Sequence, residues 1–246
     1  MTAAIHVRDL HFSYPDGTRA LNGVTVDIRS GESVALFGPN GSGKTTFVLH
    51  LNGLLRGSGE VRIGGQRVEK KNLRAVRQRV GLVFQDADDQ LFMPTVAEDV
   101  MFGPLNHGLS PEQARQAAGA ALDLVGLTGV GNRAPYQLSA GEKRRAALAG
   151  VLAVAPDILV LDEPTSSLDP PGRAALIALL ERLPQTRLIV THDLDLARQL
   201  CSRALFFEKG RIAADGPVDR VIEQMSWDKS GAFPRARRHA PADIRA

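Results

Sequence analysis

The sequence predicts an α/β fold with a mixed, mainly parallel sheet, an N-terminal antiparallel β subdomain and an inserted helical subdomain. Three observations favour this fold. Runs near the N-terminus alternate apolar with polar residues, as half-buried antiparallel strands do. Four later runs are apolar without alternation, which is typical of strands covered on both faces. Between the second and third of these runs, alanine-rich segments repeat apolar residues at helical spacing.

The size and composition indicate a globular protein. The chain has 246 residues, of which 43% are hydrophobic and 23% charged, so it can bury a sizeable core. Its net charge of +3 does not call for nucleic acid, and we expect no such partner. The single cysteine, Cys201, suits a packing role in a reducing cytoplasm. No signal peptide or membrane-spanning run is evident, so we expect membrane contact only through another protein.

The expected elements follow one another in a clear order. Half-buried strands are expected at 5–14, 24–28 and 60–63, with a turn at 15–17. Buried parallel strands are expected at 34–37, 80–84, 158–161 and 188–191. The helical subdomain covers about 94–155 and includes a helix at 111–125. We expect a folded domain over 1–225 and a basic, mobile tail over 226–246.

Each buried strand ends in a residue suited to phosphate or water chemistry. These residues are Gly38, Gln85, the pair Asp162 and Glu163, and His192. Parallel α/β sheets bind ligands beyond the carboxyl ends of their strands. For Gln85 or His192 alone, simple capping of a strand would be the better interpretation. Together, the four strand ends predict one shared site.

A phosphate loop follows the first of the buried strands, which is expected at 34–37. The pattern G-x-x-x-x-G-K-[ST] is formed by Gly38, Pro39, Asn40, Gly41, Ser42, Gly43, Lys44 and Thr45. It lies between a strand and a helix expected at 46–55, which starts at Thr46. Backbone amides would hold phosphate oxygens, Lys44 would pair with the β- and γ-phosphates of a nucleotide, and Thr45 would bind Mg²⁺. This context predicts a P-loop NTPase core and disfavours the alternative, a glycine-rich turn with a solvated lysine.

The acidic pair at the end of the run at 158–161 is suited to hydrolysis. A buried carboxylate is costly unless it meets a cation, so Asp162 is expected to bind Mg²⁺, through water. Glu163 would point toward the γ-phosphate and polarise the attacking water. A solvated acidic pair is the alternative, but four apolar residues precede this pair and Pro164 follows it.

A second phosphate-sized site is predicted near Ser139. Ser139 and Glu142 form a capping box that starts a helix through 148, which leaves Gly141 without a structural explanation. A glycine in the first turn allows close approach to the backbone, and the helix N-terminus attracts anions. The cations that follow, Lys143, Arg144 and Arg145, are interpreted mainly as a solvated face.

These motifs, in this order, resemble the ATPase of ATP-binding-cassette transporters over about residues 5 to 222. The resemblance implies a head-to-tail dimer in which each of two ATP molecules lies between a phosphate loop and the signature, Leu138 to Glu142, of the partner copy. A homodimer is favoured over a heterodimer because the chain carries a complete set of catalytic residues. It implies that Glu163 is the general base, that His192 contacts the γ-phosphate, and that Gln85 senses Mg²⁺ and relays closure. Asp169 would link the two sites, and Ser139 with Gly141 would clamp the partner's ATP. Tyr14 matches the adenine-stacking position, although core packing is the alternative.

A finer resemblance is to energy-coupling-factor ATPases, especially those of cobalt and nickel importers. It is carried by the segments 84–92, 94–100, 102–105 and 143–150. It implies a transmembrane coupling subunit, a substrate-binding membrane subunit, and a peripheral position on the cytoplasmic face of the cell (inner) membrane. Gln90, Leu91 and Phe92 are expected to contact the coupling subunit. The alternative, that Leu91 and Phe92 are core residues, is disfavoured because the polar residues at 88–90 indicate a surface loop. The sequence departs from the commonest signature at Ala140 and Glu142.

Several alternatives stay open at this point. A biotin or other vitamin importer would use the same kind of ATPase, because specificity lies in partner subunits; the scattered histidines offer no site for transported metal. A soluble ABC ATPase of DNA repair or ribosomes would usually carry long coiled coils or two fused cassettes. A P-loop kinase or GTPase would explain Lys44 and Asp162 but not the Ser139 to Glu142 segment.

Overall fold

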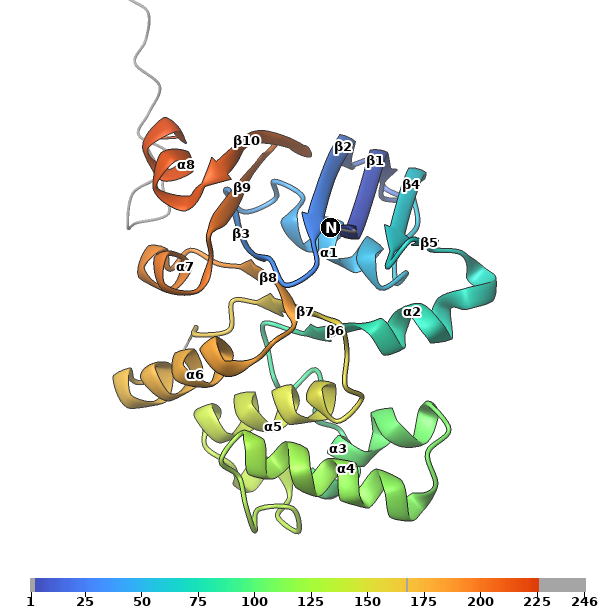
Figure 1. Cartoon of the computed structure of the whole chain (residues 1–246), viewed down its shortest axis with the longest axis vertical. Helices are drawn as coiled ribbons and strands as arrows, with labels where there is room; N and C mark the ends of the chain where they lie inside the picture. The colour runs from blue at the N-terminus through green and yellow to red at the C-terminus, as the bar shows by residue number, and fades with distance from the viewer. Residues whose placement is uncertain (1–2, 167, 226–246) are drawn as a thin grey trace, which may run out of the picture.

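The computed structural model describes residues 3–166 and 168–225. Two sheets lie side by side in the upper half of the molecule, and a group of helices lies below them (Figure 1). The tail expected at 226–246 lies outside the described residues.

A six-stranded sheet forms the centre of the α/β part. Its order is β10 (Arg211–Pro217), β9 (Arg203–Glu208), β3 (Ser33–Phe37), β8 (Thr186–Val190), β7 (Ile158–Asp162) and β6 (Val80–Val83). β10 pairs antiparallel with β9, and all other pairs are parallel. The four strands predicted to be parallel are therefore confirmed. The hairpin of β9 and β10 adds two strands that the sequence analysis does not include.

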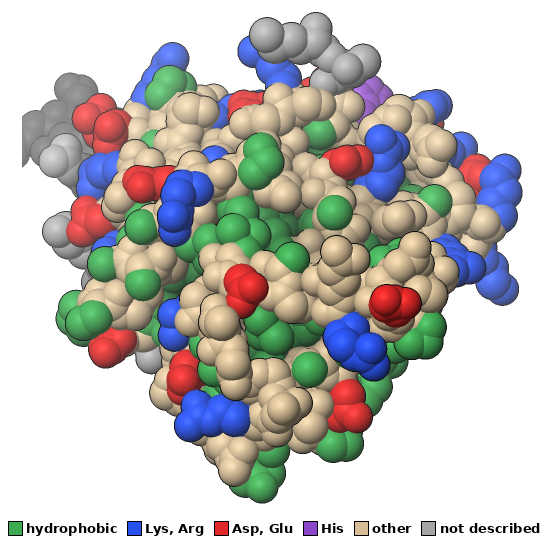
Figure 2. Space-filling view, turned by 60° about the horizontal axis from the view of Figure 1, so that its bottom comes forward, with side chains coloured by type: hydrophobic (Ala, Val, Ile, Leu, Met, Phe, Trp, Pro, Cys, Tyr) green, Lys and Arg blue, Asp and Glu red, His purple; other side chains and the backbone are tan. Residues whose placement is uncertain are grey.

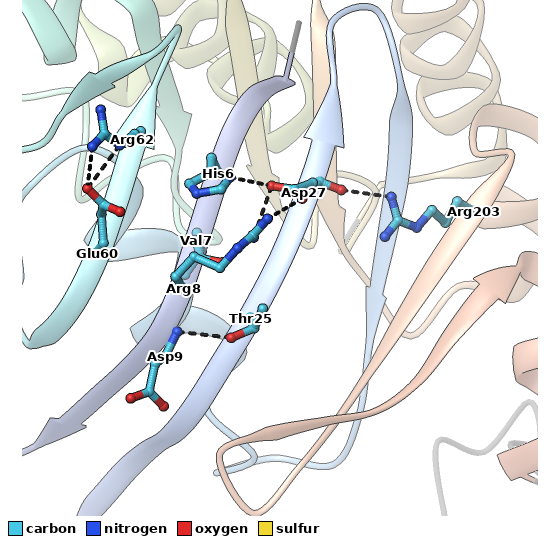
Figure 3. Close-up of polar contacts among 9 residues, drawn as sticks. All are labelled: His6, Val7, Arg8, Asp9, Thr25, Asp27, Glu60, Arg62 and Arg203. Atoms are coloured by element: carbon cyan, nitrogen blue, oxygen red, sulfur yellow. Dashed lines mark hydrogen bonds and ion pairs between the residues drawn. The ribbon is translucent and has the colours of Figure 1, made fainter. Parts of the chain in front are cut away.

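The second sheet is antiparallel, as predicted. Its order is β2 (Arg19–Arg29), β1 (Ala3–Ser13), β4 (Ser58–Ile63) and β5 (Gln66–Arg67). β2 starts earlier than expected because the chain reverses in a tight turn, in which Tyr14 N donates to Thr18 O at 2.9 Å. Figure 3 shows that Asp27 on β2 connects the antiparallel sheet to the six-stranded sheet. Its carboxylate forms hydrogen bonds with His6 and Arg8 of β1, and its backbone carbonyl accepts a hydrogen bond from Arg203 of β9.

Apolar side chains cover both faces of the six-stranded sheet, as its unbroken apolar strands predict. On β3, Val34 and Leu36 join the core beneath the antiparallel sheet, whereas Ala35 and Phe37 join the core on the opposite face. The first core includes α1 (Lys44–Leu51) and α2 (Leu73–Arg79), which follows a 3₁₀ turn, η1 (Lys70–Asn72). The second includes α6 (Pro170–Arg182), α7 (Leu194–Leu200) and α8 (Val218–Met225).

Residues 94–155 contain only helical elements. They are α3 (Val96–Asn106), α4 (Pro111–Leu124), a 3₁₀ turn η2 (Pro135–Gln137) and α5 (Ala140–Leu152), and they form the lower part of the molecule (Figure 1). Each of the three long helices begins with a capping box, whose serine or threonine caps contribute about 1 kcal/mol each.

The helix after the phosphate loop differs from its expected range. α1 begins at Lys44 and ends at Leu51, rather than covering 46–55. Gly53 adopts a φ of 69°, and its amide donates to His50 O at 3.2 Å, which closes the helix. The chain then turns back toward β4. Among the described residues, none of the helices is both long and apolar enough to cross a membrane.

Candidate active site

The phosphate loop joins β3 to α1, and its shape depends on glycine at two positions. Gly38 has a φ of 138°, and a Cβ placed there would lie 2.2 Å from Phe207 O of β9. Gly43 has a φ of 105°, and a Cβ there would lie 2.5 Å from Ala20 O of β2. Both contacts are with backbone atoms, so no side-chain movement could relieve them. The two sheets thus fix the path of the loop.

Lys44 begins α1 and is buried within the loop. Its Nζ donates to Gly38 O at 2.6 Å and to Pro39 O at 3.0 Å. Burial lowers the pKa of Lys44, while the nearby Glu163 and Asp162 carboxylates oppose that shift. The ammonium group, the loop amides and the positive end of α1 together favour an anion the size of a phosphate.

The end of β7 brings Asp162 to the start of α1. Thr45 Oγ1 donates to Asp162 Oδ2 at 3.4 Å. Burial raises the pKa of Asp162, and Thr45, Lys44 and Arg144 act in the opposite direction. Gln85, which follows β6, lines the same cleft. A hydroxyl, a carboxylate and an amide oxygen are hard ligands, so this donor set fits Mg²⁺.

Glu163 lies in a strained conformation beside His192. Its φ is 45°, in the left-handed region, which costs a non-glycine residue about 1–2 kcal/mol. Glu163 Oε2 accepts from Thr191 Oγ1 at 3.4 Å, and Oε1 lies 3.6 Å from His192 Nε2. Oε1 is buried and makes no hydrogen bond to any described residue. The strain lies in the backbone, and a carboxylate oxygen that has no hydrogen-bond donor retains a lone pair that could take a proton.

The pKa values of this pair support a role in proton transfer. Burial raises the pKa of Glu163, and the Asp162 charge raises it further, whereas the His192 amide and Thr191 lower it. Burial and the charge of Lys44 lower the pKa of His192, which favours its neutral form. A base with a raised pKa accepts a proton more readily near neutral pH.

These residues line one cleft of about 650 Å³. Tyr14 lies at its edge, where its hydroxyl pairs with Thr46 Oγ1 at 3.0 Å and its ring packs edge-on against Phe12 at 5.0 Å. Its exposed fraction is 36%, which argues against the core-packing alternative. The cleft is lined by Tyr14, the loop from Asn40 to Thr46, Gln85, Asp162, Glu163 and His192, whereas Gly38 and Pro39 are not among its lining residues.

The signature residues lie elsewhere. Ser139 caps α5, and Glu142 Oε2 accepts from Ser139 N at 2.8 Å, which forms the predicted capping box. Asp169 caps α6 by accepting from Gly172 N at 3.0 Å. Ser139, Gly141, Glu142 and Asp169 line a separate hollow of about 490 Å³, which shares no lining residue with the cleft.

Two interpretations from the sequence are wrong. Arg144 is not on a solvated face: it is 7% exposed and donates to the carbonyl oxygens of Glu163 and Ser166. Leu91 is not on the surface: it is 9% exposed and belongs to the core, because Leu91 N donates to Ala87 O and the loop turns inward. Phe92 is 62% exposed, as expected for a contact residue.

The fold and the site define an enzyme of the phosphate-loop class. A phosphate loop, an acidic strand end and a histidine meet at the carboxyl edge of a parallel sheet, an arrangement suited to bind and hydrolyse a nucleoside triphosphate. The ABC transporter family model matches residues 21–166. The chain belongs to the ABC transporter family and is one of its ATPases, in which ATP hydrolysis is coupled to transport.

Relatives of known sequence agree with this assignment. A Gloeobacter violaceus protein provisionally named as an ABC transporter ATP-binding protein is 52% identical over 225 residues, which cover 90% of this chain and 92% of the relative. The energy-coupling factor transporter ATP-binding protein EcfA of Methanothermobacter thermautotrophicus is 48% identical over 218 residues, which cover 86% of this chain and 70% of EcfA.

Solved structures share the fold. CbiO1 of Clostridium perfringens, which is part of the ABC transporter complex CbiONQ, is 35% identical with a TM-score of 0.81, covering 91% of this chain and 92% of CbiO1. An ATP-binding cassette solved as a dimer with ADP and phosphate is 29% identical with a TM-score of 0.78, covering 87% of this chain and 98% of that cassette.

Proposed function

We propose that this chain powers an energy-coupling-factor importer for cobalt or nickel, and that two copies close on ATP during each cycle. The similarity to EcfA and to CbiO1 supports the transporter type. The segments that follow Gln85 and Pro94 support the metal substrate, because they resemble those of cobalt and nickel importer ATPases. Residues 3–166 and 168–225 contain no cluster of His, Cys, Asp and Glu that could hold a metal ion, so the transported ion would bind to partner subunits.

The proposed dimer rests on one observation: the phosphate loop and the signature, each one half of an ATP site, line separate hollows of the same chain. The phosphate loop and Glu163 line the cleft, whereas Ser139, Gly141 and Asp169 line a different hollow. A Cβ on Gly141 would meet only Leu168 Cδ2, at an ordinary 3.7 Å, so nothing within the described chain requires glycine there. A second copy that brings its Gly141 backbone against ATP would require it. The dimeric cassette with ADP and phosphate supports this arrangement.

In this proposal, the residues of the cleft hold ATP and activate water. The loop amides and Lys44 bind the phosphates, while Tyr14 stacks on the adenine. Thr45, Asp162 and Gln85 would hold Mg²⁺, which neutralises phosphate charge when bound. Glu163 Oε1 accepts a proton from the attacking water, whose oxygen bonds to the γ-phosphorus as the bond to the bridging oxygen of ADP breaks. His192 keeps this carboxylate and the γ-phosphate in place.

The membrane partner is proposed to dock on an apolar patch of the helical part. Phe92, Phe102 and Leu105 are 62%, 41% and 42% exposed, and the two aromatic rings pack edge-on at 5.1 Å. Asp86, Asp88 and Asp89 line a neighbouring cleft of about 610 Å³ together with Gln85, which connects it to the nucleotide site. Figure 2 shows that hydrophobic side chains gather in a hollow on this lower side of the molecule. The patch would hold the chain at the cytoplasmic face of the membrane.

Uptake of trace cobalt and nickel tests the proposal in cells that express this chain with its membrane partners. Wild-type protein should support uptake of one ion, and Glu163→Gln should abolish it. Phe92→Ala should reduce uptake while the isolated protein still hydrolyses ATP, whereas Leu124→Ala, which also removes an exposed apolar side chain (51%), should change neither. Uptake of biotin instead of metal by an assembled, ATP-hydrolysing complex would contradict the metal assignment and support the vitamin alternative.

A further inference from the structure

Arg144 is a buried cation that lies two residues after the signature. It lies in the second turn of α5, whose cap is Ser139, and is 7% exposed. The roles proposed above do not use it. Its side chain points from the signature helix toward the loop that follows β7, which carries Glu163 and Ser166.

The guanidinium group binds this loop through both terminal nitrogens. Nη1 donates to Glu163 O at 3.2 Å, and Nη2 donates to Ser166 O and Ser166 Oγ, each at 3.1 Å. Ser166 Oγ in turn donates to Glu163 O at 2.9 Å, as does Ser166 N at 3.1 Å. The Glu163 carbonyl therefore accepts from three donors. On its other side, Glu163 N donates to Val190 O at 2.9 Å, so both peptide groups of Glu163 are held.

Stability alone does not explain a cation at this position. Burial of a charged group is costly, and the positive N-terminal end of α5 offers a cation no stabilisation. Charges of Asp86, Glu163 and Asp162 offset part of that cost, and the fork of the guanidinium matches the carbonyl and hydroxyl acceptors. The feature that these contacts stabilise is the left-handed backbone of Glu163, which is strained.

We propose that Arg144 is a positioning residue that fixes the backbone of Glu163 and thereby couples the signature helix of one copy to the general base of the same copy. This rests on the proposed roles of Glu163 and of the signature. Ser139 and Gly141, which would meet the partner's ATP, lie within about one and a half helical turns of Arg144. Engagement of that ATP moves or stabilises α5, and Arg144 transmits the change to Glu163. Each copy thus senses the nucleotide held by its partner before it hydrolyses its own.

Steady-state hydrolysis by the purified full chain tests the proposal, with Arg144→Ala, Arg144→Lys and Arg187→Ala. Arg187 is the matched control. It is half-buried on β8, where it donates hydrogen bonds to Ser33 Oγ and Leu180 O, and it lies at the opposite end of this strand from His192. Arg144→Ala should lower kcat by roughly 10- to 100-fold with KM for ATP nearly unchanged, because small misplacement of a catalytic group costs this much. Arg144→Lys should recover part of kcat, since it keeps a donor and the charge. Arg187→Ala should lower the melting temperature but keep kcat.

A second measurement uses the Glu163→Gln background, where ATP should hold the dimer closed. Adding Arg144→Ala should leave this ATP-dependent dimer intact, because Ser139 and Glu142 still cap α5. Loss of the dimer, an unchanged kcat in Arg144→Ala, or an equal loss of kcat in Arg187→Ala would each overturn the proposal. Failure of the proposed base would be seen separately, as ordinary turnover by Glu163→Gln, and failure of the transport proposal as absence of uptake.

Discussion

The phosphate loop and the signature both place a helix N-terminus where it can meet phosphate, yet the chain shapes them differently. At Gly38 and Gly43 a Cβ would collide with backbone oxygens of β9 and β2. At Gly141 a Cβ would make only an ordinary contact with Leu168. The phosphate loop is thus specified by this chain's own packing, whereas no contact within the described residues requires the signature glycine. This difference is the one that the proposed dimer predicts, in which the second half of the site is completed by a partner copy.

Glu163→Gln should sharpen this comparison with the largest effect. The substitution removes the proton acceptor but leaves the phosphate loop and the signature unchanged. We expect kcat to fall by about 10²- to 10⁴-fold, the usual contribution of a general base. ATP should then hold two copies together, which size-exclusion chromatography with MgATP would show as a dimer. Ordinary turnover would remove the assignment of Glu163 as the base.

Lys44→Ala should disable phosphate binding in the cleft formed by the phosphate loop, which one chain forms without a partner. Lys44 contributes a charged donor to the phosphates, so its loss should weaken ATP binding by roughly 10- to 100-fold, in line with 1.5–3 kcal/mol for a hydrogen bond to a charged group. The measurement is calorimetric titration with ATP. Lys71→Ala, which removes an exposed lysine paired with Glu69, is the control and should bind ATP normally. Equal binding by both variants would contradict the role of Lys44.

The sequence predicts the phosphate loop because its strand, glycines and helix form one contiguous pattern. Tertiary packing still supplies the rest, since β9 and β2 fix the path of the loop and the helix ends at Leu51 rather than at residue 55. The sequence also holds a local signal for the β9–β10 hairpin, because Gly210 follows an apolar run at 204–207 and favours a turn; in the structure, Lys209 and Gly210 adopt positive φ in a two-residue turn. A local signal for the burial of Leu91 is also present. Leu91 follows Ala87 by four residues, which is the spacing of one helical turn, and the structure buries both side chains in such a turn.

Arg144 could not be interpreted in the same way. Three consecutive cations at a helix N-terminus are usually solvated, and the chain near Arg144 offers no acceptor for it. Its acceptors, Glu163 O and Ser166 O, lie about twenty residues later and reach it only when β7 takes its place in the sheet. A charge bound to distant backbone carbonyls leaves no pattern in a single sequence. Tertiary packing alone reveals that part of the site.

A pair of glycine substitutions should test directly whether the two loops differ. Gly38→Ala should destabilise the isolated protein by roughly 1–3 kcal/mol or more, because the backbone must move. Gly141→Ala should stabilise it by about 0.5–1 kcal/mol, since alanine favours a helix over glycine. Thermal unfolding without nucleotide measures both. Gly141→Ala should nevertheless lose ATP-dependent dimerisation and hydrolysis, and a fully active Gly141→Ala protein would contradict the idea that a partner's ATP approaches this backbone.

Glu142→Gln should produce the smallest effect and should increase activity. Glu142 Oε2 accepts from Ser139 N, and hydrogen bonding to Ser139 lowers the pKa of Glu142, so the group is ionised at neutral pH. Glutamine keeps this geometry, as Gln113 does in the capping box of α4, but removes a negative charge beside the partner's phosphates. We expect turnover to rise about two- to fivefold, equivalent to 0.3–1 kcal/mol, with a larger gain at low salt. Glu98→Gln, in the capping box of α3, is the control, and an unchanged or lower rate in Glu142→Gln would show that its charge does not oppose nucleotide at the signature.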